Sequence, residues 1–76
     1  MKIGMCVVGC GEFAKVFAKS IQPMLSDIDL YFASRDLAKA KQYSFFFNGV
    51  GEFGSYEDAA KNPNIHAMYI CTPHYL

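Results

Sequence analysis

The chain has 76 residues, a formal net charge of zero and 53% hydrophobic residues. This length allows one domain at most and excludes a two-domain enzyme with its own closed cleft. Seven basic residues balance seven acidic ones, so the basic excess typical of proteins that bind nucleic acid or membrane surfaces is absent. The three cysteines lack disulfide-framework or metal-ligand spacing, which favours reduced thiols in a cytoplasmic protein and no metal site.

Apolar runs and helical spacings alternate along the chain. Residues 3–8 form a continuous apolar run of strand length, typical of a strand that is covered on both faces. Helical spacing follows over residues 12–22, and Pro23 is expected to end that helix. The apolar face of this helix is predicted to comprise Phe13, Ala14, Phe17, Ala18 and Ile21.

A second strand is predicted over residues 28–33, with Ser34 as the cap of the helix that follows. This helix is predicted to begin near Arg35 or Asp36 and to run to about Phe46, because Asn48-Gly49 is a natural helix stop. One of its faces is predicted to hold Leu37, Ala40, Ser44 and Phe47.

The remaining elements are a short strand at residues 52–53, a helix capped at Ser55 and a strand over residues 66–71. His66 is expected to be an exposed strand-end residue without a functional role. The order βαβαβαβ predicts an α/β protein with a Rossmann-type, doubly wound parallel sheet. These four strands would form the first half of such a domain, in the order 3-2-1-4.

The most informative motif is the run Gly9-Cys10-Gly11-Glu12-Phe13-Ala14, which follows the first strand and opens the first helix. Gly9 permits a tight turn, Gly11 lets the backbone approach a pyrophosphate, and Ala14 allows close packing of the helix on the strand. The free N–H groups at the helix start, including those of Glu12 and Phe13, can then bind phosphates. The alternative is a glycine turn with no ligand.

The end of the second strand decides which dinucleotide is preferred. An NAD site carries an acid there for the ribose 2′-hydroxyl, about 20 residues beyond the glycines, whereas this chain has Ser34 followed by Arg35. A hydroxyl and a guanidinium can bind a 2′-phosphate, which favours NADP. In the alternative reading Ser34 only caps the helix, Arg35 is solvated, and Asp36 reaches the ribose of NAD.

The segments VVGCGEFA, YFASRD, GSYED and NPNIHAMYICTPHYL resemble, in this order, the amino-terminal domain of the Gfo/Idh/MocA family of glucose-fructose oxidoreductases and inositol dehydrogenases. The resemblance implies that residues 1–76 are part of an NAD(P)-binding domain. It also implies that the loop after the last strand, with Cys71, Thr72, Pro73 and His74, runs beside the nicotinamide ribose. His66 departs from the family, which commonly has an acid there.

The activity that this resemblance implies is hydride transfer between NADP or NAD and a hydroxyl-bearing carbon of a sugar, inositol or related polyol, in a full-length and homo-oligomeric parent. The family's catalytic lysine, in a Glu-Lys-Pro strand, and its substrate-binding domain are not among these residues. No catalytic residue is therefore predicted here, and the chain alone is expected to bind cofactor weakly and to be inactive. No nucleic acid or membrane is expected as a partner. The alternative function is a non-catalytic NAD(P)-binding module, such as a sensor or scaffold.

Overall fold

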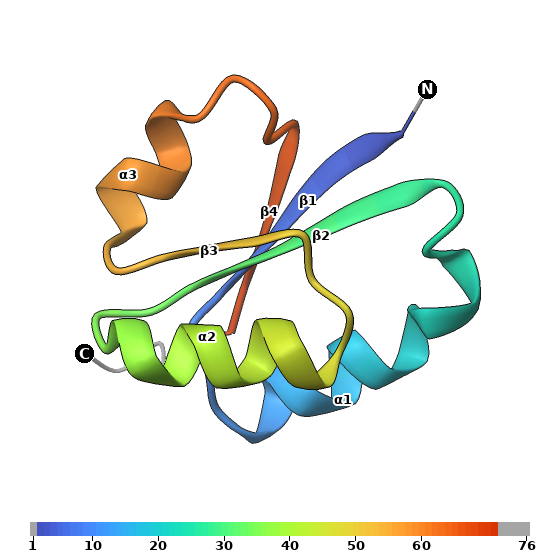
Figure 1. Ribbon diagram of the computed structural model, residues 1–76, viewed down its shortest axis with the longest axis horizontal. Coiled ribbons are helices and arrows are strands. Elements are labelled where there is room, and N and C mark those ends of the chain that lie inside the picture. The colour runs from blue at the N-terminus through green and yellow to red at the C-terminus, as the bar shows by residue number, and fades with distance from the viewer. Residues whose placement is uncertain (1, 72–76) are drawn as a thin grey trace.

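The computed structural model describes residues 2–71, in which strands and helices alternate (Figure 1). The strands are β1 (Ile3–Val8), β2 (Ile28–Ala33), β3 (Gly51–Phe53) and β4 (Ala67–Ile70). The helices are α1 (Glu12–Ser20), α2 (Leu37–Phe46) and α3 (Tyr56–Lys61), with a 3-10 turn, η1 (Gln22–Met24), after α1. Among the described helices, none has the length and apolar character needed to cross a membrane.

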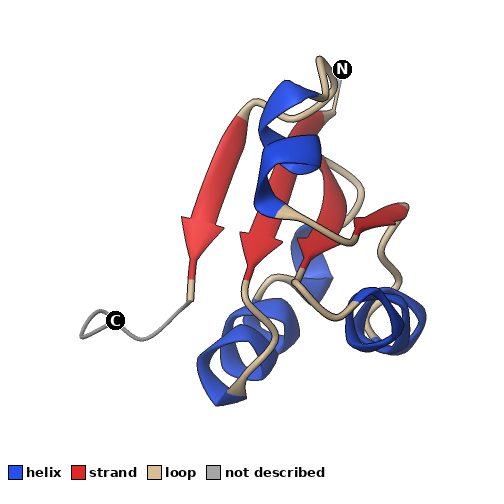
Figure 2. Cartoon of the chain, turned by 90° about the vertical axis from the view of Figure 1, so that its left-hand side faces the viewer, coloured by secondary structure: helices blue, strands red, loops and turns tan. Residues whose placement is uncertain are grey.

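The strands form one parallel sheet in the order β3-β2-β1-β4, as predicted. β1 is paired on both sides: Val8 lies opposite Ala33 of β2 and opposite Ile70 of β4. The strand that leads into the glycine motif is therefore an inner strand, with a paired neighbour on each side. Figure 2 shows β4 at the left-hand edge of the sheet.

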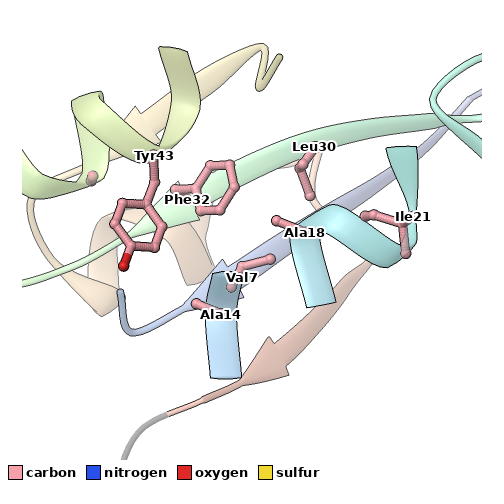
Figure 3. Packing of buried hydrophobic residues seen from close by; sticks show 8 residues of the cluster. Val7, Ala14, Ala18, Ile21, Leu30, Phe32 and Tyr43 are labelled. Carbon is pink, nitrogen blue, oxygen red and sulfur yellow. The ribbon is translucent and has the colours of Figure 1, made fainter. Parts of the chain in front are cut away.

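Two apolar clusters cover opposite faces of the sheet, because side chains alternate along each strand. The first joins α1 and α2 to β1 and β2, and is made of Val7, Ala14, Ala18, Ile21, Leu30, Phe32, Ala40 and Tyr43 (Figure 3). The second joins α3 to the other face through Cys6, Val8, Ala33 and Ala59. Helices on both faces make this a doubly wound α/β fold, and the predicted Rossmann-type fold class is confirmed.

The first helix is shorter than the predicted range of 12–22, since α1 ends at Ser20 and Pro23 lies in the first turn of η1. Its predicted apolar face is correct at Ala14, Ala18 and Ile21, which are buried. It is wrong at Phe13, which is 76% exposed. Phe17 stacks on Tyr69 of β4 with ring centroids 4.0 Å apart, but Phe13 lies one turn nearer the end of the sheet and has no such partner among the described residues.

The predicted cap of the second helix is also wrong. Asp36, not Ser34, is the N-cap of α2, and its carboxylate accepts hydrogen bonds from the N–H groups of Ala38 and Lys39. The predicted helix end near Phe46 and the cap at Ser55, which accepts from the N–H of Asp58, are confirmed.

Of the residues predicted to share one face of α2, Ala40 and Ser44 are buried, and Phe47, which follows the helix, is half-buried. Leu37 is 42% exposed, and Tyr43 is buried on this face although it was not predicted there.

Candidate cofactor-binding site

The candidate site lies at the carboxyl end of β1, where the direction of the strand order changes. From β1 the chain builds outward to β2 and β3, and it then crosses the sheet to place β4 on the other side of β1. In open α/β sheets ligands bind in the crevice at such a switch point. The turn between β1 and α1, which carries the glycine motif, lies at this position (Figure 1).

The two glycines of the turn have different geometries. Gly9 has a φ of 92°, in the region that side chains other than glycine rarely adopt, and its N–H donates to the carbonyl of Ala33 at 2.8 Å. Gly11 has an extended backbone, and a Cβ built on it would meet no heavy atom within 4 Å. Protein packing therefore does not explain a glycine at position 11, and the open space beside it can receive a phosphate group.

The start of α1 is open to an anion. Gly11 is the N-cap of α1 and supplies no side-chain cap, so the first-turn N–H groups, those of Glu12, Phe13 and Ala14, lack a side-chain acceptor from that residue. These groups carry the positive end of the helix dipole. Glu12 itself is exposed and pairs with Lys15 at 3.6 Å. Ala14 is fully buried, and its small side chain lets α1 approach the sheet closely.

Ser34 and the charged residues Arg35 and Asp36 follow the carboxyl end of β2, beside the glycine turn. Ser34 is 8% exposed, and its hydroxyl accepts a hydrogen bond from the N–H of Asp36 at 3.1 Å. The Arg35 guanidinium lies over the ring of Tyr56, with its central carbon 5.9 Å from the ring centroid. This contact ties the β2 end to the start of α3.

Cys10 links the glycine turn to this group of side chains. Burial raises the pKa of the Cys10 thiol, while the Lys39 ammonium and a hydrogen bond from Ser34 lower the pKa. The positive charge of Lys39 therefore acts on the middle residue of the glycine turn. The sequence prediction missed Lys39 and Tyr56, although a lysine in the first turn of the helix after Ser34-Arg35 was an available signal.

Backbone hydrogen bonds to β1 flank β4 at both ends. Just after the strand, the N–H of Cys71 donates to the carbonyl of Val8 at 2.7 Å, and just before it, the N–H of His66 donates to the carbonyl of Gly4 at 2.8 Å. The ladder between β1 and β4 thus reaches the predicted limits of residues 66 and 71, although the strand itself spans Ala67–Ile70. His66 is exposed at the strand start, as predicted, and its Nδ1 accepts from the N–H of Gly4 at 2.8 Å.

Four of the predicted site residues thus lie just beyond the carboxyl ends of the neighbouring strands β4, β1 and β2: Gly9, Gly11, Ser34 and Cys71. The other predicted contacts of the last loop, Thr72, Pro73 and His74, lie outside the described residues. Within residues 2–71 there is no group of three or more histidine, cysteine or acidic side chains placed to hold a metal.

No family model matches the chain. A trans-1,2-dihydrobenzene-1,2-diol dehydrogenase of Xenopus laevis is 36% identical over 73 residues, which cover 96% of this chain and 22% of that protein. The same enzyme of Mus musculus is 45% identical over 42 residues, or 55% of this chain and 13% of that protein.

Solved structures share the fold at low sequence identity. A myo-inositol dehydrogenase from Lactobacillus casei, in complex with NAD(H) and myo-inositol, superposes with a TM-score of 0.81 at 15% identity and covers 95% of this chain. An NAD-binding oxidoreductase from Klebsiella pneumoniae superposes with a TM-score of 0.83 at 18% identity and covers the whole chain. This chain spans 22% of each of those two proteins.

The described residues form a Rossmann-type α/β domain with a glycine turn after its first strand, the fold that the structural neighbours share. The predicted resemblance to the amino-terminal domain of Gfo/Idh/MocA dehydrogenases is confirmed, because both the sequence relatives and the structural neighbours are dehydrogenases of that type.

Proposed function

We propose that the chain is the dinucleotide-binding part of an NAD(P)-dependent oxidoreductase and that it prefers NADP. The observation that carries the proposal is the open space beside Gly11 at the start of α1, where no side chain of the N-cap residue caps the helix, at the carboxyl ends of the neighbouring strands β1 and β4. A dinucleotide pyrophosphate fits this position by size and charge. The bound nicotinamide would supply hydride chemistry, and the residues of this chain would bind and orient the cofactor.

The preference for NADP is supported by three side chains near the end of β2 and the start of α2. No carboxylate stands at position 34, and Oδ1 of Asp36 caps α2 by accepting from the N–H groups of Ala38 and Lys39 at 3.1 and 3.4 Å. Arg35 and Lys39 are exposed cations on either side of that cap. Two cations and the Ser34 hydroxyl suit a 2′-phosphate, which carries more negative charge than a ribose hydroxyl.

The substrate of a full-length parent is proposed to be a sugar, inositol or related polyol, since two of the structural neighbours are described with bound myo-inositol or scyllo-inositol. The loop of Cys71, Thr72, Pro73 and His74 is proposed to lie beside the nicotinamide ribose, as the family resemblance implies. The cytoplasm is the proposed location, because all three cysteines are free thiols.

The cofactor preference is tested by fluorescence or calorimetric titration with NADPH and NADH. We expect NADPH to bind about tenfold or more tightly, because charge-assisted hydrogen bonds contribute roughly 1.5 to 3 kcal/mol each. Arg35→Ala and Lys39→Ala should reduce that difference, whereas Lys41→Ala, which removes an exposed lysine from the same helix, should not. Equal affinities, or an NADH preference that neither substitution changes, would contradict the NADP assignment.

A further inference from the structure

Tyr43 is a buried side chain of α2 whose ring is fixed by aromatic neighbours. It is 9% exposed, and its ring meets those of Phe32 and Phe47 edge-on, each with centroids 5.9 Å apart. Such edge-to-face contacts hold a ring in one orientation. Figure 3 shows the ring extending from α2 toward Phe32, with its hydroxyl directed away from Leu30 and Ile21.

The hydroxyl of Tyr43 reaches the glycine turn. It donates to the carbonyl oxygen of Gly11, with 3.4 Å between the two oxygens, across 32 positions of sequence. The same carbonyl accepts the first intrahelical hydrogen bond of α1, from the N–H of Lys15 at 3.2 Å. A tyrosine hydroxyl is protonated at neutral pH and can donate, and burial raises the pKa of the Tyr43 hydroxyl further.

The carbonyl of Gly11 and the N–H of Glu12 belong to one planar trans peptide group, so they point in opposite directions. A donor that holds the carbonyl toward α2 therefore aims the Glu12 N–H away from α2. Glu12 is the first residue of α1, and its N–H is one of the groups that no side chain of the cap satisfies.

We propose that Tyr43 is a positioning residue for the cofactor pyrophosphate: its hydroxyl fixes the Gly11 carbonyl and so orients the Glu12 N–H toward the phosphate. This inference rests on the proposed function. It assigns a part in dinucleotide affinity to a residue of α2 that belongs neither to the glycine motif nor to the side chains proposed to bind the 2′-phosphate. Because the ring alone fills the core, the hydroxyl is the group that carries the proposed role.

The test separates the pyrophosphate from the 2′-phosphate by using two partial ligands. ADP-ribose carries the pyrophosphate, whereas adenosine 2′-monophosphate carries only the group proposed to bind Ser34, Arg35 and Lys39. Tyr43→Phe keeps the ring and removes the hydroxyl. We expect this variant to raise the Kd of ADP-ribose about two- to tenfold, in line with the loss of one hydrogen bond, and to leave the Kd of adenosine 2′-monophosphate unchanged.

The matched control is Tyr31→Phe, which removes a hydroxyl from a tyrosine that packs against the cluster on the opposite face of the sheet. This control should change neither Kd. An unchanged Kd for ADP-ribose in Tyr43→Phe overturns the positioning role, and so does an equal loss for both ligands, which would indicate a general effect on the fold. If the wild-type chain binds neither ligand, the proposed function itself fails.

A second measurement needs no ligand. The NMR order parameter of the Glu12 amide should fall in Tyr43→Phe and stay at the wild-type value in Tyr31→Phe, because only the first variant removes one of the two hydrogen bonds that the Gly11 carbonyl accepts. An unchanged order parameter in Tyr43→Phe would overturn the inference.

Discussion

Gly4 and Gly11 are both glycines of the first strand-turn-helix segment, but packing within the chain requires glycine only at position 4. A Cβ on Gly4 would fall on the backbone carbonyl of Asn64, so glycine is needed there for the approach of two chain segments. A Cβ on Gly11 would enter open space. The sequence motif cannot make this distinction, because it records only residue types and spacing.

The first prediction at the residue scale concerns Gly11→Val. The added side chain would occupy the proposed pyrophosphate position without touching the protein, so NADPH binding should be lost while the chain remains folded. Glycine is a modest N-cap, so the free energy of unfolding should fall by less than about 1 kcal/mol. Calorimetry and circular dichroism measure the two effects. Undiminished binding would place the phosphates elsewhere. Gly4→Val should differ by unfolding the chain, because its side chain would collide with the backbone of Asn64.

The second prediction at this scale concerns Cys6. Burial, with a smaller contribution from Cys10, raises the pKa of this thiol from 9.0 to about 12. In the unfolded chain the thiol ionises near its ordinary pKa, so the unfolded state binds fewer protons than the folded state between these pKa values. The contribution of Cys6 to the free energy of unfolding should therefore be fully present below about pH 9 and be lost as the pH rises toward 12.

Urea denaturation at several pH values tests the role of Cys6. Cys6→Ala should show a smaller loss of stability over that range, since the titrating group is gone. A wild-type chain and a Cys6→Ala chain with identical pH dependence would show that other groups account for the loss.

At the scale of elements, the sequence predicts strands better than helix ends. The bounds of β1 and β2 agree with the predicted residues 3–8 and 28–33, because both strands are covered on two faces and therefore appear as continuous apolar runs. The sheet order follows from the alternation of strands and helices and from right-handed crossovers. These features depend on local sequence and on general rules of chain topology.

The helix errors have a different cause. Ser34 and Asp36 are both good caps, and the choice between them depends on where β2 ends and how the chain turns toward α2. Phe13 has the right spacing for the apolar face but lies beyond the strands that could cover it. Lys39 and Tyr43 belong to the site only because α2 lies beside the glycine turn. Periodicity predicts which residues share a face of a helix, but it does not predict which other elements lie against that face.

The prediction at this scale concerns the cap of α2. Asp36→Ala removes the acceptor for two backbone N–H groups and should lower the free energy of unfolding by about 1 kcal/mol. It also removes a negative charge beside the proposed 2′-phosphate position, so NADPH affinity should rise. Asp36→Asn keeps an acceptor and removes the charge, and it should raise NADPH affinity with little loss of stability. Loss of NADPH affinity in both variants would indicate that Asp36 contacts the cofactor directly.

At the scale of the whole molecule, the sheet has an unusual edge. β4 pairs with β1, and among the described residues no strand pairs with its other side. Met68, Tyr69 and Ile70 are 39%, 44% and 68% exposed. No lysine or proline interrupts the strand, although such residues commonly protect natural edges from pairing with other chains. At the opposite edge, β3 is only three residues long and offers a shorter template.

We therefore expect the 76-residue chain to associate through β4, either as a dimer or as larger, poorly soluble species. Sedimentation velocity over a concentration series should show the average mass rising with concentration. Ile70→Lys places a charge on the exposed apolar edge and should shift the chain toward monomer, whereas Val50→Lys changes an apolar residue that is 57% exposed outside β4 and should not. Because Tyr69 stacks on Phe17 and supports α1, it is left intact in both variants. A monomer at all concentrations would show that the edge is not available for pairing, and equal effects of the two substitutions would assign any association to general apolar exposure instead of to β4.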